Sequence, residues 1–128
     1  MNPKTHIEFY KSLGHLFYAI AAIDNDIKDE EINTLKAIIE SDWLTSNEAS
    51  NYIFETFRQL QHIENTNTED SFQRFIDFKN THQTLFNKIL NSKIINTAAA
   101  IANSYAKQNK SELIALAKLH IELKKEQS

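Results

Sequence analysis

Apolar residues recur at spacings of three and four along most of the chain, and short polar stretches interrupt this pattern. Such spacing gathers apolar side chains on one face of an α-helix. The pattern predicts an all-α fold of about six helices. We expect the first three to run from Asn2 to about Ile23, from Asp29 to the Asp42–Leu44 segment, and from the capping-box pair Thr45 and Glu48 to Ile63. The other three are expected from Phe72 to Leu90 with a break or bend at Asn91-Ser92, from Ile94 to Tyr105, and from Asn109 into Leu113, Leu116, Leu119 and Leu123.

The first of these helices is expected to be the central one, because its apolar positions cover more than one narrow face. Asn2 suits the N-cap, and Pro3 suits the first helical position, where its missing N–H is not needed. Gly14 lies inside the helical pattern, where it costs about 1 kcal/mol relative to Ala. A close crossing by another helix is the expected compensation.

Composition supports helices and a single domain. The 128 residues include only one Gly and one Pro, whereas β-rich folds spend these residues on turns. Hydrophobic residues at 41% and charged residues at 24% are ordinary globular values, so residues 1–128 are expected to form one domain. The absence of Cys excludes disulfides, thiolate metal sites and cysteine nucleophiles.

Charge and hydropathy limit the classes of partner. A net charge of −3 offers no general attraction to nucleic acid. No stretch approaches the roughly 18 unbroken apolar residues of a membrane span, and the first residues lack the apolar block of a signal peptide. We therefore expect a cytoplasmic protein with no nucleic-acid partner and no membrane insertion, acting as a monomer or a weak homodimer.

The stretch from Ala19 to Leu35 joins an apolar helix to a second helix through an acidic turn. Five of its carboxylates fall within eight residues: Asp24, Asp26, Asp29, Glu30 and Glu31. Acidic residues favour the positive end of a helix dipole, which is the simplest interpretation of this turn. Asp24, Asp26 and Glu31 could instead hold a hard cation such as Ca²⁺ or Mg²⁺ through oxygen ligands.

This turn is not an EF-hand. Its spacing matches the second half of such a loop, with Glu31 at the last ligand position. However, Ile20 and Ala22 would occupy the first and third ligand positions, and neither carries a side-chain oxygen. Lys28 also stands where a capping hydroxyl would be expected, so only half of a capping box can form around Glu31.

The chain partly repeats itself 81 positions later. Ala19-Ile20-Ala21 lines up with Ala100-Ile101-Ala102, and Glu31-Ile32 lines up with Glu112-Leu113. This similarity predicts two related helical halves, although apolar residues at helical spacing also align by chance. The second copy lacks the acidic turn.

The segment AIAAIDNDIKDEEINTLKAII resembles the signature of TerB-like tellurite-resistance proteins, and AAAIANSYAKQNKSELIALAKL resembles the second copy in that family. The matching positions are Asp24, Ile27, Glu31, Leu35 and, in the second copy, Glu112; Asn25 replaces the family's Gly. The resemblance implies an all-α domain with a non-enzymatic role as an interaction or scaffold module linked to stress or tellurite resistance. It also implies a divalent cation on conserved acids and a protein partner.

Other chemistry receives little support from the residues. The five His form no Glu-x-x-His or His-x-x-x-His pair, and one Gly cannot build a phosphate-binding or dinucleotide-binding loop. We expect a non-enzymatic module whose binding patch includes Asp29, Glu30, Glu112 and Trp43, with Trp43 exposed beside the end of the second helix. The alternatives are a small-ligand-binding or enzymatic protein with a pocket between the halves, and a self-association module.

Overall fold

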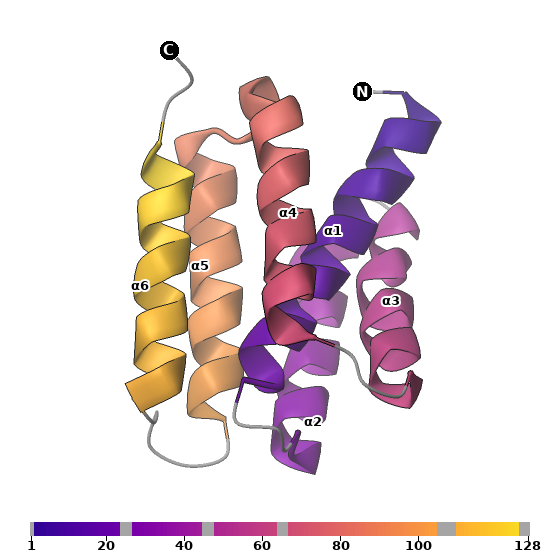
Figure 1. The fold of residues 1–128 in the computed structure, drawn as a ribbon. Helices are drawn as coiled ribbons and strands as arrows, with labels where there is room; N and C mark the ends of the chain where they lie inside the picture. The colour runs from indigo at the N-terminus through magenta and orange to yellow at the C-terminus, as the bar shows by residue number, and fades with distance from the viewer. Residues whose placement is uncertain (1, 24–26, 45–47, 64–66, 105–109, 126–128) are drawn as a thin grey trace.

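The computed structural model describes residues 2–23, 27–44, 48–63, 67–104 and 110–125, which form helices and no strands (Figure 1). The predicted all-α fold is confirmed. The helices are α1 Pro3–Ala21, α2 Asp29–Ile38, α3 Asn51–His62, α4 Thr68–Thr81, α5 Lys88–Asn103 and α6 Lys110–Lys124. Three short turns adjoin them: the π-helical η1 Ile39–Trp43 and the 3₁₀ turns η2 Glu48–Ser50 and η3 Gln83–Leu85.

Helix α1 is the central element, as its broad apolar face predicts. It packs against α3, α4 and α5, and Figure 1 shows it crossing behind α4. Leu13, Leu16, Phe17 and Ile20 are completely buried. The helix begins as expected, because the Asn2 side chain accepts a hydrogen bond from the Thr5 N–H at 2.8 Å.

Gly14 marks a close crossing between α1 and α3, which confirms the expectation from the sequence. A Cβ placed on Gly14 would lie 2.6 Å from the Thr56 Cβ and 2.7 Å from the Ile53 carbonyl oxygen. Contacts this short do not occur between real side chains. Gly is therefore required here by the separation of two helices, and the propensity it costs α1 is offset by packing.

The break between the fourth and fifth helices lies earlier than the sequence predicts. Helix α4 ends at Thr81, and α5 begins at Lys88, so Asn91 and Ser92 lie inside a helix. The Asn87 side chain accepts the Leu90 N–H at 2.8 Å and caps α5. Periodicity alone could not locate this break, because apolar residues keep helical spacing on both sides of it.

Helix α6 lies at the edge of the fold. It packs mainly against α5 and, over a shorter stretch, against α1. In Figure 1 it forms the outermost helix on the side away from α3. Across the described ranges, no helix has both the length and the apolar character needed to cross a membrane.

Candidate functional site

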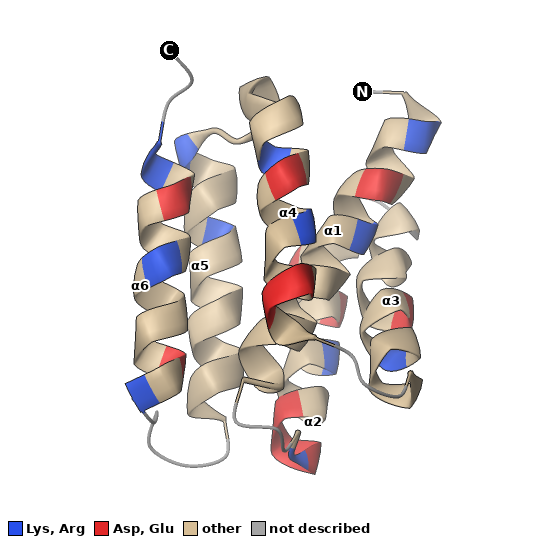
Figure 2. Cartoon of the chain, viewed as in Figure 1, with Lys and Arg blue, Asp and Glu red and all other residues tan. Residues whose placement is uncertain are grey.

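The first turn of α2 carries the acidic residues that the sequence singles out. Asp29 and Glu30 are exposed there, and Figure 2 shows them as a red end on α2. Glu31 is only 5% exposed, because its Oε1 turns back to accept the Lys28 N–H at 2.8 Å. The half capping box expected around Glu31 is thus present, and this carboxylate serves the start of the helix.

The cation site proposed on Asp24, Asp26 and Glu31 stays a prediction. Asp24 and Asp26 lie outside the described residues. Within the described ranges, no three His, Asp or Glu side chains gather closely enough to hold a metal ion. Of the predicted ligands, the structure therefore places only Glu31, and one of its oxygens already accepts a backbone N–H.

Trp43 does not lie on the surface, so its expected place in a binding patch is wrong. The π-helical turn at the end of α2 directs this side chain into the core, where it is 2% exposed. Its Nε1 donates to the Thr97 Oγ1 at 3.3 Å, and the Lys93 Nζ lies 4.2 Å from the ring centroid. Its edge-on contacts with Tyr10 and Phe17 complete an aromatic cluster.

Glu112, the matching residue of the second copy, is also buried. It lies in the first turn of α6 and is 7% exposed. A side chain with so little exposed surface cannot contribute to a broad binding patch. Only Asp29 and Glu30 of the predicted patch are therefore exposed to a partner.

Helix α6 exposes apolar side chains on its outer face. Leu113, Ile114 and Ile121 are 53%, 54% and 58% exposed. Exposed Ala117 lies between them at helical spacing, so the four residues form one stripe, which we call the α6 stripe. The inner face is covered separately, by Ala115, Leu116, Leu119 and Leu123, all of which are buried.

Positive charge surrounds the α6 stripe. Lys110 and Lys124 are exposed near its two ends, and Lys118 lies beside it, reaching the Phe72 ring with its Nζ 5.1 Å from the centroid. The acids of α6 do not offset this charge, because Glu112 is buried and Glu122 pairs with Lys125 at 2.8 Å. Figure 2 shows the lysines spaced along the helix.

This stripe was not predicted from the sequence, because Leu113 was grouped with Leu116, Leu119 and Leu123 and no second apolar face was considered. The structure places Leu113 on the outer face instead. A signal was available in the seven-residue spacing of Ile114 and Ile121, which lies off the row of buried leucines. Two apolar rows on one helix indicate that two sides of it can be covered.

Together, the fold and this surface define a small all-α domain with one edge helix uncovered on its apolar outer side. No family model, curated protein or solved structure matches the chain. The resemblance of the Ala19–Leu35 stretch to TerB-like proteins accordingly stays a prediction.

Proposed function

We propose that this protein is a non-enzymatic interaction module whose α6 stripe binds an acidic amphipathic helix of a partner protein. One observation carries the proposal: three large aliphatic side chains of a single helix are each more than half exposed, in one row. Single exposed apolar residues are common on protein surfaces, but contiguous rows with a polar rim mark interaction sites.

The shape of the α6 stripe favours a helical partner. Leu113, Ala117 and Ile121 are spaced by four, and Ile121 follows Ile114 by seven, which is the pattern by which two helices pack along their length. Ala117 is small and lies in the middle of the stripe, so a partner helix can approach closely. Recognition of an amphipathic helix by an apolar surface is a recurring mode of peptide binding.

The charge of the rim favours an acidic partner over a second copy of this chain. In a symmetric pair of α6 helices, Lys110 and Lys124 of the two copies would lie opposite one another when the helices run antiparallel. Like charges facing each other oppose association, whereas Asp and Glu on a partner would steer it toward the stripe. An acidic amphipathic helix satisfies both the apolar row and the lysines.

We take the biological role of such docking from the TerB-like resemblance, and propose that it serves stress or tellurite resistance. A divalent cation at the acidic turn belongs to the same proposal. Calorimetric titration with Ca²⁺, Mg²⁺, Mn²⁺ and Zn²⁺ tests it, with Asp24→Asn/Glu31→Gln as the comparison. Absence of heat with every metal removes the cation from the proposal and leaves the docking surface untouched.

A designed peptide tests the docking surface directly. The probe is a helical peptide of about 20 residues with leucines at heptad spacing flanked by glutamates, and its control replaces those glutamates with lysines. We expect the acidic peptide to bind the protein and the basic one not to bind. The double substitution Ile114→Ser/Ile121→Ser should weaken binding at least about tenfold, because roughly 1 kcal/mol of apolar burial is lost at each position.

The matched control is Ile63→Ser, which removes an Ile of similar exposure, 57%, at the end of α3. It should leave peptide binding unchanged. The proposal fails if both variants bind the acidic peptide as the parent does. It also fails if light scattering shows a dimer that Ile114→Ser/Ile121→Ser dissociates, or if the stripe binds anionic vesicles and not the peptide.

A further inference from the structure

A pocket of about 830 Å³ lies where the carboxyl end of α4, the amino end of α5 and the carboxyl end of α6 meet, at the top of Figure 1. Four lysines line it: Lys79, Lys88, Lys124 and Lys125. No Asp or Glu of the described ranges lines this pocket. The chain as a whole has an excess of acids, so this concentration of positive charge is a local property of the fold.

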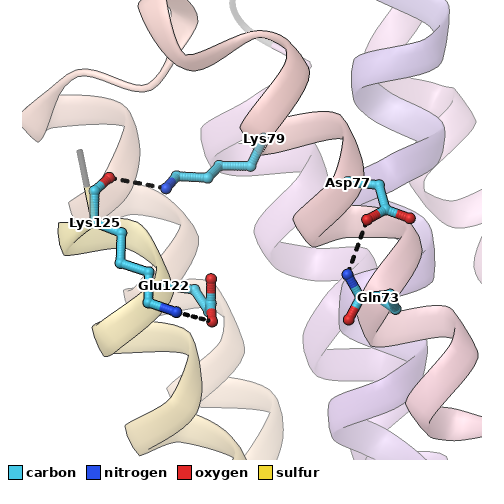
Figure 3. Close-up of polar contacts among 5 residues, drawn as sticks. All are labelled: Gln73, Asp77, Lys79, Glu122 and Lys125. Carbon is cyan, nitrogen blue, oxygen red and sulfur yellow. Dashed lines mark hydrogen bonds and ion pairs between the residues drawn. The ribbon is translucent and has the colours of Figure 1, made fainter. Parts of the chain in front are cut away.

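Lys79 supplies a buried positive charge at the wall of the pocket. The residue is 2% exposed, and its Nζ donates to the Lys125 carbonyl oxygen at 3.0 Å (Figure 3). In the described part of the chain no carboxylate lies within ion-pair distance of this Nζ; the nearby Glu122 pairs with the Lys125 ammonium. Burial lowers the pKa of Lys79, although the charge of Glu122 opposes the shift.

Burial of the Lys79 ammonium is unfavourable, and the charge of nearby Glu122 offsets this cost only in part. An anion bound in the pocket would offset this cost. The interaction would be stronger than at an exposed lysine, since the surroundings of Lys79 screen charge weakly.

The amino end of α5 adds donors to the same region. The side chain of its cap, Asn87, accepts the Leu90 N–H, and the first amides of an α-helix, here those of Lys88 and Ile89, have no acceptor inside the helix. Such helix starts favour anions. At the carboxyl end of α6, Leu123 O accepts from the Asn91 Nδ2 at 3.3 Å, and Lys125 O, just beyond the helix, accepts from the Lys79 Nζ.

Apolar side chains occupy the rest of the lining. Phe86, Ile95 and Leu123 contribute carbon surface beside the lysines. An inorganic anion makes no favourable contact with such apolar surface, whereas an organic group attached to the anion can pack against it. The pocket therefore combines recognition of charge with recognition of an apolar group.

We propose that this pocket binds a small phosphate monoester, with the phosphate among the lysines and the organic group on Phe86, Ile95 and Leu123. A phosphate monoester carries close to two negative charges and several acceptor oxygens. It can therefore interact with several lysine ammonium groups at once, more favourably than a carboxylate with its single charge. None of the four residues of the α6 stripe lines this pocket, although Lys124 belongs both to the pocket and to the rim of the stripe.

The competing explanation is structural: Lys79 caps the end of α6, Lys125 pairs with Glu122, and the remaining lysines are solvated. The two explanations differ in what exposed lysines contribute. Replacing Lys88 and Lys125, which are both exposed, leaves the Lys79 hydrogen bond to the Lys125 backbone in place. If the lysines form a binding site, this change weakens ligand binding; if they are solvated, it does not.

Phenyl phosphate is the probe, titrated by calorimetry and by NMR against the full chain at constant ionic strength. Inorganic phosphate, benzoate and phenol serve as comparison ligands. We expect saturable binding of phenyl phosphate, weaker binding of inorganic phosphate and of benzoate, and none of phenol. The variant Lys88→Gln/Lys125→Gln should bind phenyl phosphate about tenfold more weakly.

The matched control is Lys4→Gln/Lys36→Gln, which removes the same charge from exposed lysines of α1 and α2. It should bind phenyl phosphate as the parent does. The proposal is overturned if phenyl phosphate shows no saturable binding, if both double variants weaken it equally, or if benzoate binds as tightly. Binding that survives Ile114→Ser/Ile121→Ser supports a site separate from the α6 stripe.

Discussion

Replacement of Gly14 by Ala tests the central packing of the fold. In an unhindered helix interior this change stabilises the protein by about 1 kcal/mol, because Ala has the higher helix propensity. Here the new Cβ would lie 2.6 Å from the Thr56 Cβ and 2.7 Å from the Ile53 carbonyl oxygen. Neither neighbour can move alone, because one is the branch point of a buried β-branched side chain and the other is helix backbone.

Helices α1 and α3 would therefore have to separate along their crossing. Overpacking of this kind costs about 1–3 kcal/mol, and contacts with rigid atoms belong at the upper end of that range. Subtracting the propensity gain leaves a net loss of about 2 kcal/mol. For a chain of this length the melting temperature should fall by roughly 6–8 °C.

Urea denaturation followed by far-UV circular dichroism measures the loss directly. Glu8→Ala, at an exposed position on α1, is the control and should stay within about 0.5 kcal/mol of the parent. A Gly14→Ala protein that is more stable than the parent by about 1 kcal/mol would refute the close crossing, since that is the behaviour of a Gly with open space beside it.

Two further predictions concern buried side chains. Trp43→Ala should cost about 3–5 kcal/mol in the free energy of unfolding, and in the parent the emission of this single Trp should shift to longer wavelength on unfolding in urea. Burial, together with the charge of Arg74, lowers the pKa of His15 below its usual value of about 6.5. Because the unfolded chain then takes up the proton first, stability should fall as the pH drops below about 6.5. Urea titrations between pH 5 and 7.5 should show that His15→Gln reduces this fall. Equal slopes for the parent and His15→Gln would contradict the assignment.

Local chemistry in the sequence was enough to predict the fold class and several of its details. The 3.6-residue periodicity predicts the helices, and Asn2, Pro3 and Glu31 predict how two of them begin. These features depend on neighbours within one turn of the chain, so they can be deduced without knowing the tertiary structure. Gly14 is a partial exception, because its cost within a helix indicates that another element must lie close by.

The exposure of individual side chains could not be predicted in the same way, because the identity of an apolar residue does not show whether another helix packs over it. Trp43 was expected on the surface and lies in the core, while Leu113 was grouped with Leu116, Leu119 and Leu123 and, unlike them, lies on the surface. The lysine pocket could not be predicted from the sequence either. Lys79 and Lys125 are 46 positions apart and meet only because α4 and α6 end on the same side of the fold. The sequence by itself determines the helices and their caps, whereas packing among the helices decides which faces are covered and which charges gather.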